Sequence, residues 1–97
     1  MKSKLEAINS MIDRIHEFGC TVTIPYSQPS PLVVLFDGYF SSAAYIPLHP
    51  STLYIYGMDG SISVSDVAEV RQISDNTYVI TFGRIDCMFD MMIKILK

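Results

Sequence analysis

The chain is poor in charged residues, cysteine, glycine and proline, and each shortage excludes a class of protein. Only 18% of its 97 residues are charged and 49% are hydrophobic, whereas globular chains carry about 25% charged residues. This balance excludes a disordered chain, which needs low hydrophobicity and high net charge. Two cysteines, five glycines and five prolines are too few for a disulfide scaffold or a collagen-like repeat. We therefore expect one folded domain over residues 1–97 with a modest core.

Clusters of charge of one sign are also absent. The formal net charge is −3, and the seven lysine and arginine residues are scattered along the chain. Binding to nucleic acid depends on clustered Lys and Arg that replace phosphate counterions. The sequence therefore argues against nucleic acid as a partner, unless folding brings Arg14, Arg71 and Arg84 together.

No hydrophobic run is long enough to cross a membrane. The longest one, residues 32–36, is far shorter than the roughly 20 residues that a bilayer span needs. Glu6, Asn9 and Asp13 interrupt the segment where a signal peptide has its apolar stretch. We expect no membrane partner and a cytoplasmic location.

The two cysteines, Cys20 and Cys87, lie far apart in the sequence and fit no metal-binding spacing. In an intracellular chain we expect both thiols to be reduced and to act as small core residues.

One amphipathic helix is predicted for residues 4–18. Ser3 and Glu6 have the spacing of a capping box, and Gly19 follows where a left-handed residue ends many helices. The apolar stripe recurs at spacings of three and four residues and consists of Leu5, Ile8, Ile12 and Ile15, widened by Met11 and Phe18.

Alternation of apolar and polar residues predicts strands through the rest of the chain. The expected strands are residues 20–26, 32–36, 39–46, 52–57, 61–64, 67–73, 77–82 and 85–95. Asp37-Gly38 is a strong hairpin signal between the second and third of these, and Gly57 to Gly60 predicts another hairpin. Pro25 indicates that its strand is an edge or ends there. Residues 66–70 fit either one helical turn or a strand.

The last segment, 85–95, fits a helix or a strand. As a helix it has one polar stripe, and as a strand it has one wholly apolar face. A two-residue turn at Gly83-Arg84 would pair Phe82 with Ile85, and each further pair is chemically compatible, so we favour the strand. Such a long last strand would be an exposed edge unless something covers it.

The fold class that follows is α+β. We expect one N-terminal amphipathic helix packed on a mostly antiparallel, curled β-meander of about six strands, which could form a partly open small barrel.

No residue pattern predicts catalysis, a metal site or a cofactor. His16 adjoins the apolar stripe of the helix, and His49 lies in a loop between two prolines, but no nucleophile motif accompanies either one. On a strand, Asp86 and Asp90 would be about 13 Å apart, which is too far for a catalytic carboxylate pair. We expect no catalytic, cofactor-binding or metal-binding residues.

The aromatic residues carry the positive hint. Tyr54 and Tyr56 share one face of a strand whose other face holds Leu53 and Ile55, and Tyr45 belongs to the neighbouring hairpin. If the aliphatic pair points to the core, the tyrosines point outward, and tyrosine is enriched at protein interfaces.

These observations favour a non-enzymatic protein that binds a protein partner or itself, as an inhibitor, an adaptor or a regulatory subunit. An accessory protein of a phage or mobile element would fit this description, and so would a homodimer. The alternatives are a small nucleic-acid-binding barrel and a small ligand-binding or enzymatic domain that uses the His49 loop.

Overall fold

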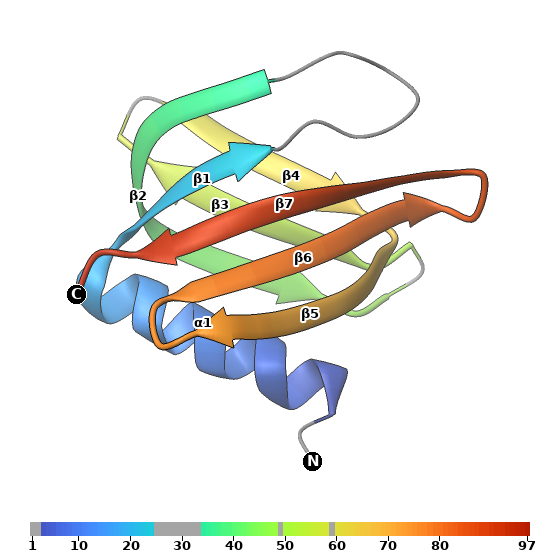
Figure 1. The fold of residues 1–97 in the computed structure, drawn as a ribbon, viewed down its shortest axis with the longest axis horizontal. Helices are drawn as coiled ribbons and strands as arrows, with labels where there is room; N and C mark the ends of the chain where they lie inside the picture. Colours follow the sequence, from blue (N-terminus) through green and yellow to red (C-terminus); the bar gives the residue numbers. More distant parts are fainter. Residues whose placement is uncertain (1–2, 25–33, 49, 59) are drawn as a thin grey trace.

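The computed structural model describes residues 3–24, 34–48, 50–58 and 60–97. In this part of the chain, one helix packs against one antiparallel seven-stranded sheet (Figure 1). The elements in chain order are α1 (Lys4–Phe18), β1 (Cys20–Ile24), β2 (Val34–Ile46), β3 (Thr52–Gly57), β4 (Gly60–Ser65), β5 (Val67–Ser74), β6 (Thr77–Arg84) and β7 (Cys87–Ile95). The α+β class and the curled, unclosed sheet are as the sequence predicts.

The helix has the predicted bounds and the predicted caps. The Ser3 hydroxyl accepts a hydrogen bond from the Glu6 backbone N–H at 3.2 Å, and Gly19 ends the helix at a φ of +81°. Its buried face is centred on Ile8, Met11 and Ile15. Leu5, expected in the apolar stripe, is 48% exposed.

The predicted hairpin at Asp37-Gly38 is wrong, because both residues lie inside the single long strand β2. Phe36 and Tyr39, on either side of them, pair with the consecutive residues Val22 and Thr21 of β1. The Asp-Gly sequence therefore forms an irregularity in the β1–β2 ladder, as a β-bulge does. Of the predicted strands, residues 25–26 and 32–33 lie outside the described part of the chain.

The strand order is β4-β3-β2-β1-β7-β6-β5. The first strand is therefore interior and ends at Ile24, immediately before Pro25. The last strand lies between β1 and β6, so the prediction that it is an exposed edge is wrong. The two edge strands are instead β4 and β5, which are consecutive in the sequence but lie at opposite ends of the sheet.

The passage from β4 to β5 needs one residue, Asp66, whose φ is +58°. Its backbone N–H donates to the Ser51 carbonyl at 2.7 Å, and its carbonyl accepts from the Gly83 N–H at 3.1 Å. This corner curls the sheet and brings β5 beside α1 (Figure 1). Residues 67–70, for which the sequence allowed a helical turn or a strand, belong to β5.

The β6–β7 hairpin has the predicted strands but a different turn. Arg84 pairs with Cys87 and Phe82 with Phe89, so the turn is Ile85-Asp86 and every pair shifts by four residues from the expected one. Gly83, placed in the turn by the sequence, is in β6 at a φ of +112°, where a β-carbon would overlap the Cys87 backbone oxygen. A shift of four leaves each side chain on its predicted face.

The core lies between α1 and the concave face of the sheet. Side chains from the helix and every strand contribute, including Ile8, Ile15, Leu53, Ile80 and Ile93. Cys20 is buried there as predicted, but Cys87 is exposed at the end of β7, so its assignment to the core is wrong. In the described residues no helix is long and apolar enough to cross a membrane.

Candidate interaction surface

Tyr54 and Tyr56 stand side by side on the outer face of β3. Their ring centroids are 6.1 Å apart with an interplanar angle of 10°. Leu53 and Ile55, which alternate with them, are completely buried, so the predicted division of β3 into an aliphatic inner face and a tyrosine outer face is correct. Tyr56 is 41% exposed, and Tyr54 is half-buried.

Small side chains flank both rings on the neighbouring strands. Tyr54 pairs with Ala44 of β2 and with Ser63 of β4. Tyr56 pairs in the same way with Ser42 and Ser61. The residues that pair with the two rings on either side are therefore all much smaller than tyrosine. The serines were not singled out from the sequence, although the alternation Ser-Ile-Ser-Val-Ser in 61–65 predicts that they share one face.

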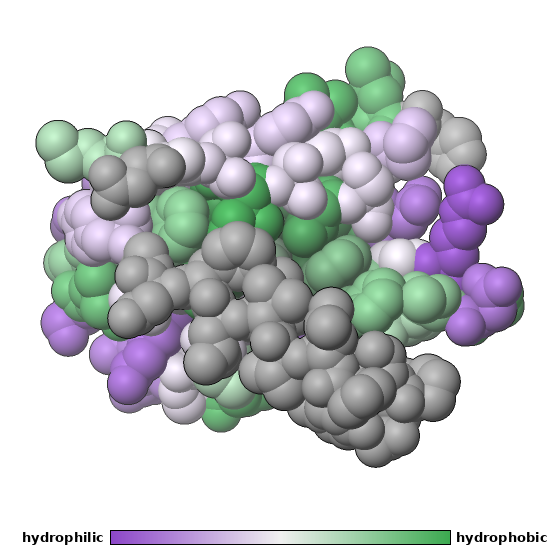
Figure 2. Space-filling model, turned by 90° about the horizontal axis from the view of Figure 1, so that it is seen from above, coloured by the Kyte–Doolittle hydropathy of each residue, from purple (hydrophilic) through white to green (hydrophobic). Residues whose placement is uncertain are grey.

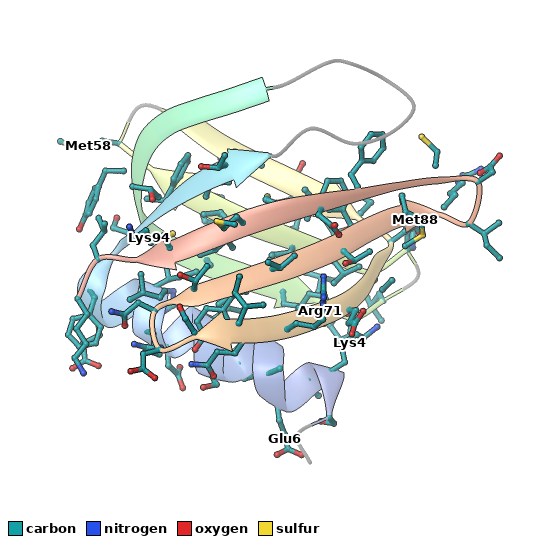
Figure 3. All side chains as sticks on the ribbon, viewed as in Figure 1. Lys4, Glu6, Met58, Arg71, Met88 and Lys94 are labelled. Carbon is teal, nitrogen blue, oxygen red and sulfur yellow. The ribbon has the colours of Figure 1, made fainter. Side chains whose placement is uncertain are left out.

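The strand that carries the tyrosines and the strand beside it, β4, have no charged side chains. Neither Thr52–Gly57 nor Gly60–Ser65 contains an acidic or basic residue. In the view from above, pale, weakly polar residues form the band along the upper border, where β4 lies (Figure 2). Met58 projects from the β3–β4 turn at the end of this band (Figure 3) and is 98% exposed. We call Tyr54, Tyr56 and their flanking residues Ser42, Ala44, Ser61 and Ser63 the tyrosine face.

Tyr45 lies on the opposite face of the sheet. It pairs with the buried Leu53 and packs, partly buried, against the core. It lines a surface depression of about 460 Å³ together with Lys4, Leu5, Pro47, Ser51, Asp66 and Val67. The structure therefore brings Tyr54 and Tyr56 together and separates them from Tyr45.

The polar groups of this depression hold the backbone in place. Lys4 Nζ donates to the Val67 carbonyl at 3.1 Å, and the Val67 N–H donates to Ser51 Oγ at 3.1 Å. Both contacts fasten the start of β5, one to α1 and one to the segment before β3. The Val67 backbone thus makes two hydrogen bonds to side chains that line the depression.

Of the histidines and aspartates considered from the sequence, the three that the structure describes, His16, Asp86 and Asp90, lie in α1, in the β6–β7 turn and in β7. His16 Nε2 contacts the backbone of Ala43, and His49 lies outside the described residues. Asp90 accepts a hydrogen bond from Thr81 Oγ1 at 2.7 Å, whereas Asp86 is exposed in the β6–β7 turn. Within the ranges that the structure describes, no three His, Cys, Asp or Glu residues are grouped so that they could hold a metal ion.

The three arginines do not form one basic patch. Arg14 donates to Asn76 Oδ1 in the β5–β6 turn at 2.6 Å, and Arg84 ends β6 eight residues further on. At about 3.3 Å per residue, Asn76 and Arg84 are roughly 26 Å apart. Arg71 lies on β5 (Figure 3), with 3.9 Å between its Nε and Oε2 of Glu69.

Comparison with known proteins adds no relative. The chain matches no family model, no curated protein and no solved structure.

Proposed function

We propose that this chain is a non-enzymatic protein that binds another protein through its tyrosine face, in a regulatory or inhibitory role. The observation that carries the proposal is the stacked pair Tyr54–Tyr56, which small, uncharged residues flank on both neighbouring strands. Tyrosine supplies a large, rigid contact area with a hydrogen-bonding tip, and serine supplies adaptable hydrogen bonds. The same combination is enriched in antibody binding loops.

The stacking also favours binding on entropic grounds. Each tyrosine has only two side-chain torsions, and the neighbouring ring restricts them before any partner arrives. Immobilising a flexible side chain at an interface costs about 0.5–1.5 kcal/mol, and a ring that is already held loses less. Because the face is uncharged, we expect its binding to depend only weakly on salt concentration.

Affinity capture from an extract of the encoding organism tests the proposal with three immobilised chains. These are the wild type, the Tyr54→Ser/Tyr56→Ser double variant and the Ile85→Ser control. The control removes a side chain that is 98% exposed, at the β6–β7 turn and away from the tyrosine face. We expect the wild type and the control to retain the same protein and the double variant to lose it. A protein retained equally by all three chains, or by none, would contradict the proposal.

A further inference from the structure

The outer edge of β4 is open. This strand is the last one at its end of the sheet, and in the described part of the chain it pairs only with β3. Gly57 and Gly60 pair on either side of a two-residue turn, and such flanking residues exchange both backbone hydrogen bonds. From there, hydrogen-bonded and non-hydrogen-bonded pairs alternate along β3 and β4. Ser61 and Ser63 are in non-hydrogen-bonded pairs, so their backbone N–H and C=O groups point away from β3.

The other edge, β5, has several features that prevent strand pairing. Its register with β6 shifts between Val67 and Glu69 and again between Gln72 and Ser74. Glu69 and Arg71 place charged side chains along it. Natural edge strands avoid unwanted pairing by such bulges and charges, and by cover from a neighbouring element. Helix α1 supplies that cover through Lys4, which binds the Val67 carbonyl.

Strand β4 has neither a bulge nor a charged side chain. Its pairing with β3 is continuous over six residues, and the segment Gly-Ser-Ile-Ser-Val-Ser contains no charge and no proline. An uncharged, regular edge strand of this kind is a template for another strand. Within the described residues, the chain thus protects the β5 edge with bulges, charges and a helix contact, whereas β4 has neither a bulge nor a charge.

We infer that β4 pairs in antiparallel fashion with β4 of a second copy of this chain. A twofold axis at Ser63 places this residue opposite its own equivalent and Ile62 opposite Val64 of the partner subunit. Serines then face serines on one side, aliphatic residues face each other on the other side, and no like charges meet. The half-buried Ile62 gains an apolar neighbour.

The pairing of two β4 strands would also bring two tyrosine faces together. This part of the inference rests on the proposed function. A twofold axis perpendicular to the sheet keeps the outer faces of both copies on the same side. The two tyrosine pairs would then be separated by the two β4 strands, which is three strand spacings or about 14 Å. The dimer would present a doubled binding surface, which increases avidity for a partner that spans both halves.

Light scattering over a tenfold concentration range tests the pairing in solution. The wild type should approach twice the 10.9 kDa mass of one chain as its concentration rises. Ser63→Pro removes the outward N–H without removing a bond to β3, and Ser63→Lys places a charge on the edge. Both variants should keep the mass of one chain, while the matched control Ser63→Ala should associate like the wild type.

Circular dichroism verifies that each variant folds, and Ser63→Lys carries the test if the proline variant does not. The Tyr54→Ser/Tyr56→Ser variant should still dimerise, which separates this inference from the proposed function. A wild-type mass of one chain at every concentration would overturn the pairing. A Ser63→Lys variant that associates as strongly as the wild type would also overturn the pairing. If only the Tyr54→Ser/Tyr56→Ser variant lost the dimer, the contact between the two copies would lie on the tyrosine face instead of the β4 edge.

Discussion

His16 on α1 binds the backbone of Ala43 in β2. Its Nε2 atom lies 3.1 Å from the Ala43 nitrogen and 3.0 Å from the Ala43 oxygen. The neighbouring strand β1 begins at Cys20, which pairs with Phe40, so β1 does not reach this part of β2. A helix side chain thus takes the position of the missing strand.

Replacing His16 with alanine should expose this stretch of β2. We expect the free energy of unfolding to fall by about 1 kcal/mol, the usual net value of one hydrogen bond. The Ala43 amide should exchange with solvent faster. Glu17→Ala, on the same exposed turn of α1, is the matched control and should change neither quantity. Equal effects of both substitutions would show that the contact has no specific role.

Arg14 fastens α1 to the β5–β6 hairpin. It donates to Asn76 Oδ1 at 2.6 Å, to Tyr78 Oη at 3.2 Å and to the Asp75 carbonyl. Tyr78 is only 2% exposed, so removal of Arg14 deprives a buried hydroxyl of its donor. Arg14→Ala should lower the free energy of unfolding by about 2 kcal/mol. Arg14→Lys should restore only part of this loss because lysine lacks the planar fork of donors.

A double-mutant cycle isolates the contact with Tyr78. In a Tyr78→Phe background the hydroxyl is already absent, so Arg14→Ala should cost less than in the wild type, by about 0.5 kcal/mol or more. Denaturant unfolding measures all four chains. Strictly additive losses would show that Arg14 acts only through the turn residues.

The two thiols should differ in reactivity. Burial raises the pKa of Cys20 to about 12, whereas Cys87 is exposed. Cys20 pairs with Ile95 of β7, eight residues and roughly 26 Å from Cys87, so the two cannot form a disulfide. At about pH 8 a thiol reagent should modify one cysteine rapidly in the folded chain, and Cys87→Ser should abolish that phase. Two rapid phases would contradict the burial of Cys20.

The raised pKa also predicts a dependence of stability on pH. The folded value lies above the ordinary value of 9.0, so the folded state holds the thiol proton more tightly than the unfolded state. This contribution is complete below about pH 9 and is lost as the pH rises toward 12. The stability advantage of the wild type over Cys20→Ala should therefore shrink over this interval, as measured by denaturant unfolding at each pH.

Features set by local periodicity were predictable from the sequence. The capping residues and the 3.6-residue stripe define α1, and the alternation in 52–57 places Tyr54 and Tyr56 opposite the core residues Leu53 and Ile55. The outward direction of these two tyrosines follows from this alternation without knowledge of the sheet order.

Features set by distant pairing were not predictable in the same way. Asp37-Gly38 has the chemistry of a turn, and only the arrival of β1 beside β2 makes it a bulge. The predicted β6–β7 register differs from the observed one by four residues. An even shift keeps every side chain on the same face of the sheet, so the chemistry of the residue pairs could not distinguish the two registers. The edge position of β4 likewise depends on the strand order, in which β1 lies between β2 and β7 and the chain turns at Asp66 from β4 to β5.

Amide hydrogen exchange at low and high protein concentration tests most directly whether the β3–β4 hairpin is where this protein associates. If β4 pairs with β4 of a second copy, the Ser61 and Ser63 amides should exchange rapidly in dilute solution and become protected as the concentration rises. Ala68 and Ile73, at the irregular positions of β5, should exchange at the same rate in both conditions. Protection at β5 instead, or rates at Ser61 and Ser63 that do not respond to concentration, would contradict this pairing.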